Sequence, residues 1–494
     1  MSHPRADELD ASRVIMWFRA DLRLQDNPAL YAAAQQGTVI PVFVHETEKD
    51  TQGYAGAAGQ WWLHHSLIDL QRSLRGALRF YAGSAATILP ELCRHYNVQE
   101  VYSNRSYTPT GMALERAAKQ ALLQEQVSSS IHNGSYLWEP DSLRKTDGTP
   151  YQVFTPFYRN ALEHAPLPHF PLPAPPRLEL LPVESAISDE IDVIDLAQLQ
   201  LLPHHPWVDK LESCWDVGEA AAHARIQEFV DADLSHYSAA RDFPAIGGVS
   251  RLAPYLAWGQ VSPNQLWHVR DITSNDGATE GQRQELGAFR RQLGWREFSA
   301  TQLCANPHMR RENLRAKFDK FPWRTNIVDL QRWQRGLTGY PLVDAGMREL
   351  WDTGYMHNRV RMVAGSFLVK NLLLHWRHGE DWFRDCLLDA DYANNCASWQ
   401  WVAGCGADAA PYFRIFNPVT QARKFDFHAA YVRRFVPQLR ELPLQYIFEP
   451  WKAPAPVLHA AGIELGYNYP CPCVDLKASR QRALAAYAQI KQSP

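Results

Sequence analysis

Short apolar runs alternate with longer stretches of mixed polarity near the start of the chain. The apolar runs cover residues 13–18, 39–44, 78–81 and 98–103, and each has the length of a buried strand. The stretches between and after them, residues 28–37, 59–75, 87–96 and 109–124, have the spacing and end signals of helices. Alternation of strands and helices predicts a parallel, doubly wound sheet.

Polar residues follow the predicted strands at the edge where such sheets bind ligands. Arg19 follows the first strand, His45 the second, and Asn104 with Arg105 the last. The glycine pattern of dinucleotide-binding folds does not follow the first strand, and no P-loop sequence occurs in the chain. The pattern therefore argues against conventional dinucleotide and P-loop chemistry in this part.

The pattern changes after a proline-rich run at residues 165–177. Strand signals nearly vanish beyond it, and helices are expected at residues 219–232, 263–272, 280–305, 341–353, 358–376, 382–388 and 479–490. We therefore expect an α/β doubly wound N-terminal domain over residues 12–140, a long connector over 141–210, and an all-α C-terminal domain over 211–490.

One stretch, residues 389–426, is dense in carboxylates, amides and aromatic rings. Asp389 and Asp391 are followed by Asn394 and Asn395, and then by Trp399 and Trp401. Because the stretch nearly lacks the apolar periodicity of a core helix, it is expected to be a polar loop around a large planar ligand. A calcium loop is the main alternative, but its glycine and final glutamate are missing.

Two other clusters in the helical part combine arginine with amide or aromatic groups. Gln292, Trp295 and Arg296 are spaced to share one helical face. Asn358 and Met362 are one turn apart, with arginines beside them. Both clusters fit a groove that follows phosphates and stacks bases, although a solvated basic face with a buried Trp has the same pattern.

A third cluster, Gly247-Gly248-Val249-Ser250-Arg251, precedes an expected helix. Backbone N–H groups and a hydroxyl at such a turn can hold a phosphate. Ordinary helix caps look the same and are commoner, so this motif is weak evidence by itself.

Composition narrows the class of protein further. The 494 residues carry a net charge of −3, which argues against a uniformly basic nucleic-acid coat but allows a local basic groove. The eight cysteines form no C-x-x-C pair, so zinc is not expected, and an iron–sulfur site built from distant cysteines stays open. The polar N-terminus lacks the features of a signal or transit peptide, and no apolar run is long enough to span a membrane. We expect a cytoplasmic protein with reduced thiols.

The motifs together resemble the photolyase/cryptochrome family. The resemblance rests on MWFRADLRLQDNPAL and WWLHHSL near the start, on HYSAARDFP, SRLAPYLAWGQVSP, LGWREF, TGYPLVDAGMREL and MHNRVRM, and on residues 389–426. The chain is most similar to class I cyclobutane pyrimidine dimer photolyases. The resemblance implies an α/β antenna-type domain, a connector, and an α-helical domain that binds FAD and DNA.

The resemblance also implies roles for individual residues. FAD would be bound by Tyr237, Val249, Ser250, Arg251, Leu252, Ala253, Asn358, Arg361, Asp389, Asp391 and Asn395. Electrons would pass along Trp323, Trp376 and Trp399. The flipped-out dimer would meet Gln292, Trp295, Asn358, Met362 and Trp401, and the DNA backbone Arg241, Arg296, Arg359 and Gln421. Asn395 would face the flavin nitrogen that gains a proton on reduction.

The implied function is that of a deoxyribodipyrimidine photo-lyase. Under light, reduced FAD would donate an electron to a pyrimidine dimer in DNA. The protein would be a monomer and would not associate with a membrane. A second, antenna chromophore could be a folate, a flavin or a deazaflavin. The alternatives are a blue-light signalling cryptochrome without repair and a (6-4) photolyase, whose active-site histidines are replaced here by Asn358 and Met362.

Three positions depart from the family's pattern. Gln292 stands where class I enzymes have a glutamate, which predicts a lower repair yield. Val249 and Ala253 replace hydroxyl residues of the phosphate-binding segment, which predicts weaker FAD binding. Thr108 replaces a glutamate of the folate antenna site, so a folate is not favoured over the other antennas.

Overall fold

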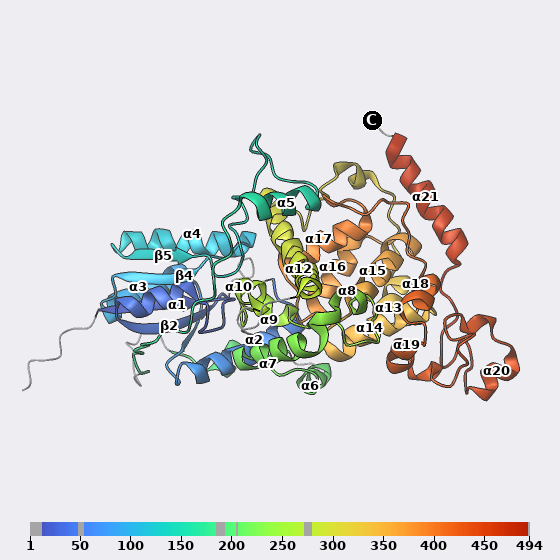
Figure 1. Ribbon diagram of the computed structural model, residues 1–494, viewed down its shortest axis with the longest axis horizontal. Coiled ribbons are helices and arrows are strands. Elements are labelled where there is room, and N and C mark those ends of the chain that lie inside the picture. Colours follow the sequence, from blue (N-terminus) through green and yellow to red (C-terminus); the bar gives the residue numbers. More distant parts are fainter. Residues whose placement is uncertain (1–11, 48–53, 184–192, 204–205, 271–278, 493–494) are drawn as a thin grey trace, which may run out of the picture.

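The computed structural model describes residues 12–47, 54–183, 193–203, 206–270 and 279–492. The molecule has two parts that lie side by side along its long axis (Figure 1). A sheet flanked by helices forms one end, and a larger assembly of helices forms the other. The α/β class of the first part and the helical class of the second are both confirmed.

The sheet of the first part has five parallel strands in the order β3-β2-β1-β4-β5. The strands are β1 (Arg13–Phe18), β2 (Thr38–His45), β3 (Arg79–Ala82), β4 (Glu100–Asn104) and β5 (Ser128–His132). Helices α1 (Pro28–Gln36), α2 (Ala57–Ser73), α3 (Ala85–Tyr96) and α4 (Pro109–Gln124) connect them. The direction of the strand order reverses between β1 and β4, which is the doubly wound topology.

The fifth strand was not expected. Its sequence, Ser-Ser-Ser-Ile-His, carries no apolar run, because β5 lies at the sheet edge with its residues at most half-buried. Pairing with the buried strand β4 determines its conformation.

The connector contains helix α5 (Phe154–His164) and then runs back along the sheet. The backbone N–H of Val39 donates to Glu179, and that of Leu181 donates to Val39. The connector therefore packs against the first domain through backbone contacts. Sequence patterns had given no helix at 154–164.

The second part is built from helices of very different lengths. They include α8 (Tyr237–Ala240), α9 (Ala253–Ala257), α10 (Pro263–Trp267), α12 (Glu280–Ala305), α14 (Pro341–Thr353), α15 (Asn358–Ser366), α16 (Trp376–Cys386), α17 (Tyr392–Ala403), α18 (Pro418–Phe425) and α21 (Leu476–Gln492). The helix expected at 263–272 ends earlier, as α10, and residues 271–272 lie outside the described part of the chain.

Two expectations in this part were wrong. The single helix expected at 358–376 is broken: α15 passes into a π-helical turn, Phe367–Asn371, Leu373 takes a φ of 60°, and α16 begins at Trp376. The stretch 389–426 is not a loop, because it contains α17 and α18. Helix α17 is buried on most of its sides, so it lacks the polar face that an amphipathic pattern would reveal.

Buried polar groups join the two parts. Arg23 is 1% exposed and donates to the backbone oxygens of Asp26, Gly134 and Gly259, the last of which belongs to the helical part. Glu297 of α12 accepts hydrogen bonds from the backbone N–H groups of Leu137 and Trp138 through Oε2. These buried hydrogen bonds fix the relative placement of the two parts.

Candidate functional site

A cavity of about 630 Å³ opens in the helical domain. Its volume lies in the range of sites for large cofactors and ligands. Most predicted site residues line it: Tyr237, Arg241, Val249, Ser250, Arg251, Leu252, Ala253, Gln292, Trp295, Arg296, Asn358, Arg361, Met362, Asp389, Asp391, Asn395, Trp399 and Trp401. Side chains from segments more than 100 residues apart in sequence therefore converge on one site.

Two aspartates, Asp389 and Asp391, form one wall of the cavity and make different contacts. Asp389 Oδ2 accepts from Arg361 at 2.9 Å, while its buried Oδ1 has no hydrogen-bond partner among the described residues. Asp391 Oδ1 caps α17 by accepting from the backbone N–H of Asn394 at 2.8 Å. An unpartnered buried acceptor in a cavity wall is ready to bind a ligand donor.

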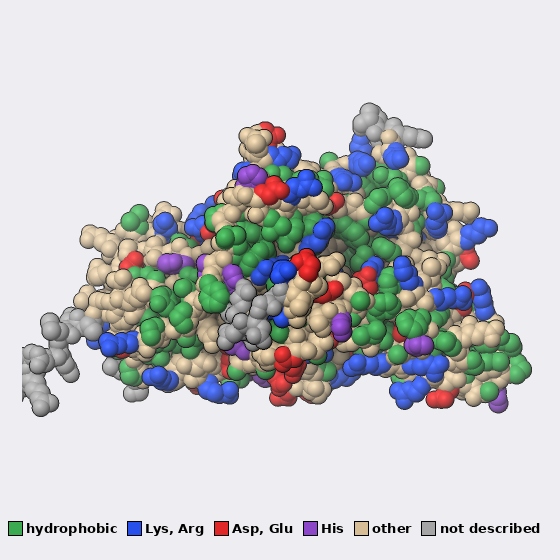
Figure 2. Space-filling model, in the orientation of Figure 1, with side chains coloured by type: hydrophobic (Ala, Val, Ile, Leu, Met, Phe, Trp, Pro, Cys, Tyr) green, Lys and Arg blue, Asp and Glu red, His purple; other side chains and the backbone are tan. Residues whose placement is uncertain are grey.

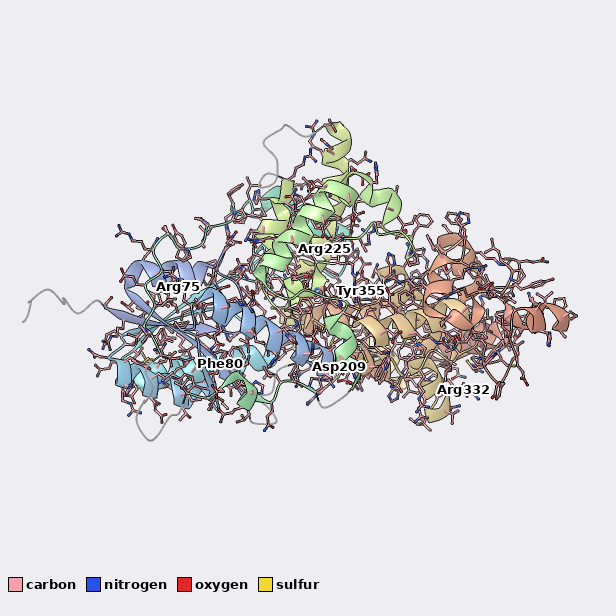
Figure 3. The ribbon with its side chains drawn as sticks, turned by 90° about the horizontal axis from the view of Figure 1, so that it is seen from below. Arg75, Phe80, Asp209, Arg225, Arg332 and Tyr355 are labelled. Carbon is pink, nitrogen blue, oxygen red and sulfur yellow. The ribbon has the colours of Figure 1, made fainter. Side chains whose placement is uncertain are left out.

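The segment 249–253 forms a second wall and is held from outside the cavity. Arg225 donates to the backbone oxygens of Ser250 at 2.8 Å and of Val249 at 3.4 Å, and Figure 3 shows Arg225 and Tyr355 near the middle of the molecule. Arg251 has a left-handed φ of 53°, and its guanidinium lies over Trp215 at 4.3 Å and Tyr355 at 5.3 Å. This conformation is uncommon for a residue with a Cβ, and it directs a cation towards the cavity wall.

A third wall combines amides, a thioether and rings. Gln292 Oε1 accepts from Arg241 at 3.1 Å, and its Nε2 donates to the backbone oxygen of Ala288 at 3.2 Å. Trp295 is stacked on Phe154 of α5 with ring centroids 3.7 Å apart. One face of the Trp295 ring is thereby covered, which leaves the other face for a planar ligand.

Asn358 and Met362 lie on the same face of α15, as their spacing predicted. Asn358 Nδ2 is 4.0 Å from the Met362 sulfur, and both side chains line the cavity. Trp401 reaches the cavity from α17. Figure 2 shows apolar side chains gathered in the upper middle of the molecule, around α5 and α12.

Two of the three predicted electron-transfer tryptophans lie away from the cavity. Trp399 lines it, whereas Trp376 is fully buried at the start of α16 and donates to Asn313 Oδ1 at 2.8 Å. Trp323 packs against His375 with ring centroids 5.1 Å apart, and His375 against Trp376 at 5.6 Å. The ring neighbours of Trp399 include Phe383 at 4.9 Å and Trp333 at 6.0 Å.

Two further residues predicted to contact the DNA backbone, Arg296 and Arg359, have protein partners. Arg296 donates to the backbone oxygen of Ser135 at 2.6 Å, and its side chain is 13% exposed. Arg359 pairs with Asp242 at 2.5 Å. Gln421 lies on α18, outside the cavity. In this structure Arg296 acts mainly as a contact between the two domains.

The polar groups predicted at the sheet edge bond mainly to other side chains and backbone groups of the first domain. Asn104 Nδ2 donates to Asp21 at 2.6 Å and to Asn27 at 2.7 Å, and Arg19 donates to the Asn104 backbone oxygen. Thr108 caps α4 by accepting from the backbone N–H of Gly111 at 3.1 Å. Thr108 stands where the folate pattern has a glutamate, and its role as a helix cap explains the threonine at this position.

Comparison with known proteins decides the family. Residues 14–176 match a family model described as DNA photolyase, and residues 289–489 match the FAD binding domain of DNA photolyase. A deoxyribodipyrimidine photo-lyase of Agrobacterium fabrum is 46% identical over 98% of this chain and 99% of its own length. The chain belongs to the DNA photolyase family.

Cryptochromes are also among the relatives. Cryptochrome-2 of Arabidopsis thaliana is 34% identical over 97% of this chain and 79% of its own length. The crystal structure of a bacterial class III photolyase from Agrobacterium tumefaciens superposes with a TM-score of 0.91, at 44% identity over 99% of both chains. The family assignment from the motifs is confirmed, and the structural relative comes from class III.

The helical domain is an FAD-binding domain, and the cavity suits that cofactor. Asp389 Oδ1 is a free acceptor for a ring N–H, and Arg251 places a cation beside the segment predicted to hold the phosphates. The chemistry of these groups matches a molecule with a hydrogen-bonding ring and a diphosphate.

Sequence reasoning missed several residues around the site. Phe154 supports Trp295, and Tyr54 and Glu380 contact Asn395. Each of these partners lies on a different element from the residue it contacts, so no spacing within one helix could reveal it. No group of three or more His, Cys, Asp or Glu suited to a metal ion occurs in the described part of the chain, and all eight cysteines are free. None of the described helices is long and apolar enough to cross a membrane.

Proposed function

We propose that the protein repairs cyclobutane pyrimidine dimers in DNA by light-driven electron transfer. The observation that carries the proposal is that the residues predicted to bind FAD and those predicted to contact the dimer line the same cavity. Asp389, Asp391 and Asn395 face it beside a wall that includes Trp295 and Trp401. Bound FAD, when reduced and excited by light, supplies the electron that splits the cyclobutane ring.

The chain's own residues bind and orient the lesion. Trp295 offers one free ring face, and Asn358 and Gln292 offer amide groups to the edges of the two bases. A dimer that stacks poorly in the duplex costs less to flip out than an intact pair, and the aromatic wall repays part of that cost by stacking. Arg241, at the same wall, and Arg359 and Gln421, outside it, are proposed to contact the DNA backbone.

No proton-transfer group is needed for this reaction, and the amide at position 292 fits that. The class I enzymes that the sequence resembles have a glutamate at this position. Gln292 still accepts from Arg241 and can still bond the dimer, but it supplies no charge or proton. We expect Gln292→Glu to raise the repair yield, measured as dimers split per photon absorbed. An unchanged or lower yield would contradict this reading.

The first experiment illuminates the purified, FAD-containing protein with DNA that carries a defined thymine dimer. Restored thymines, counted by chromatography, should appear in the light and not in the dark. DNA with a (6-4) photoproduct serves as the control substrate, because Asn358 and Met362 occupy the positions where (6-4) enzymes carry histidine. Failure to restore the thymine dimer would favour the alternative of a signalling cryptochrome, which the 34% identity to Cryptochrome-2 keeps relevant.

A second, antenna chromophore stays a prediction, as do the monomeric state and the cytoplasmic location. A solved archaeal photolyase from Sulfolobus tokodaii, 26% identical over 97% of this chain, is described as holding two FAD molecules. We expect an absorption spectrum of the purified protein to distinguish folate, flavin and deazaflavin antennas from FAD alone.

A further inference from the structure

Asn395 is held from behind the cavity wall by residues of two different domains. Its Nδ2 donates to the Tyr54 hydroxyl oxygen at 2.7 Å and to the backbone oxygen of Glu380 at 3.1 Å. A backbone oxygen can only accept, so the amide must present its NH₂ group on that side. Since Asn395 also lines the cavity, its Oδ1 is the atom left to face the cavity.

The Tyr54 hydroxyl can act only as an acceptor towards Asn395, because its single proton is donated elsewhere. It donates to Glu380 Oε1 while accepting from Asn395. Burial is the main reason that the pKa of Tyr54 is raised well above its ordinary value, so the phenol keeps its proton. Glu380 Oε2 accepts from Arg310 Nε at 3.2 Å, which keeps the carboxylate in place as an acceptor.

The segment that carries Tyr54 belongs to the first domain and is docked tightly on α16. A Cβ at Gly56 would lie 2.3 Å from the Asp385 Cα, so the two backbones are in direct contact. The backbone N–H of Ala57 donates to Asp385 Oδ1 at 3.0 Å, and the Tyr54 ring packs on Tyr392 with centroids 4.7 Å apart. Tyr54 is therefore a fixed part of the helical domain's wall.

We propose that Tyr54 is a positioning residue for the bound flavin, and that it acts by orienting the Asn395 amide. This rests on the proposed function, in which Asn395 faces the flavin nitrogen that gains a proton on reduction. With Nδ2 tied to Tyr54 and Glu380, Oδ1 offers an acceptor to that N–H. An acceptor there stabilises the reduced, protonated flavin, whereas a rotated amide would oppose a donor to a donor.

The test replaces Tyr54 by phenylalanine in the full-length holoprotein. Tyr54→Phe keeps the ring but removes the hydroxyl acceptor, so Nδ2 loses its shortest hydrogen bond and keeps the longer ones to Glu380. Losing one hydrogen bond of this kind should lower the equilibrium constant for forming the protonated, reduced flavin about fivefold. That corresponds to a midpoint potential about 40 mV more negative for a one-electron couple, together with faster reoxidation in air.

Tyr392→Phe is the matched control, because it also removes a hydroxyl from the same pair of packed rings. Its potential should equal that of the wild type. Asn395→Ala tests the route: if Tyr54 acts through the amide, the double variant should have the same potential as Asn395→Ala alone. Thermal unfolding and FAD content are measured for every variant to confirm folding.

The outcomes separate the two claims. A wild-type potential in Tyr54→Phe, with a shifted one in Asn395→Ala, overturns the role of Tyr54 and leaves the proposed function standing. Additive shifts in the double variant overturn the action through Asn395. A protein that binds FAD but fails to restore thymines overturns the proposed function while the potential of Tyr54→Phe still reports on the amide.

Discussion

Gly379 allows helix α16 to lie directly against the Trp399 ring. A Cβ added at Gly379 would lie 2.0 Å from Cη2, 2.4 Å from Cζ3 and 2.5 Å from Cζ2 of that ring. Carbon atoms in contact normally stand about 3.5–4.0 Å apart, so the shortest distance falls about 1.5 Å short. Trp399 is 2% exposed, and its other neighbours include Phe383 and Trp333. The ring can therefore yield mainly towards the cavity.

We expect Gly379→Ala to destabilise the protein and to impair FAD binding. Overpacking of a dense core costs about 1–3 kcal/mol, and here it outweighs the gain of up to about 1 kcal/mol from replacing a helical glycine. For a chain of 494 residues the entropy of unfolding is about 1 kcal/mol per degree, so a loss of about 1–3 kcal/mol should lower the Tm by roughly 1–3 °C. A ring displaced into the cavity should also reduce the FAD content and slow the reduction of bound flavin by light.

Gly365→Ala is the matched control. It lies on α15 against the same ring, but an added Cβ would be 3.6 Å from Trp399 Cζ3 and 3.3 Å from Val402 Cγ1. These distances need at most a small shift of one methyl group, so the Tm and the FAD content should stay near the wild-type values. Differential scanning calorimetry and flavin absorbance measure both variants. If Gly379→Ala matches the wild type in both measurements, the packing argument is refuted.

Three further predictions concern buried charges. Asp389→Asn should weaken FAD binding about tenfold to a hundredfold in a fluorescence titration of the apoprotein, because it removes the charged partner of Arg361 and a free acceptor. Burial lowers the pKa of Lys370 to about 7, so the unfolded state binds more protons from there up to its own pKa near 10.4. The free energy of unfolding from urea titrations should therefore rise between pH 7 and 9, and less steeply in Lys370→Met. Burial raises the pKa of Glu297 to about 7, which stabilises the fold below about pH 4.3 and is lost as the pH rises through 7. Glu297→Gln should flatten that fall between pH 5 and 7.5, and an identical slope in the variant would contradict it.

The first domain follows closely from its sequence. Apolar runs predicted four of the five strands, with β1 at its observed bounds, and helical spacing predicted α4 at its observed bounds. In a parallel sheet covered on both faces, buried strands consist almost entirely of apolar residues, so the pattern is strong. The edge strand β5 is the exception, because its pairing with β4 and not its own sequence makes it a strand.

In the helical domain the sequence predicted which residues gather, but not the shape of the segments that carry them. Helix α17 is buried against the cavity on one side and against the core on the others, so polar and apolar residues follow no single stripe. The break between α15 and α16 lies within a mainly apolar run, SFLVKNLLLHW, in which every residue but His375 is buried, and local sequence gave no signal for it.

The sequence by itself determined the family and most of the groups that line the cavity, because motifs preserve the chemistry of a site residue by residue. Only the tertiary structure decided how those groups are oriented. Tyr54 and Asn395 are 341 residues apart, and the amide's orientation depends on their hydrogen bond. Gly379 matters because the Trp399 ring of another helix lies against it. Contacts between distant segments leave no periodic pattern in the sequence, so the orientation of the side chains in this site can be known only from the tertiary structure.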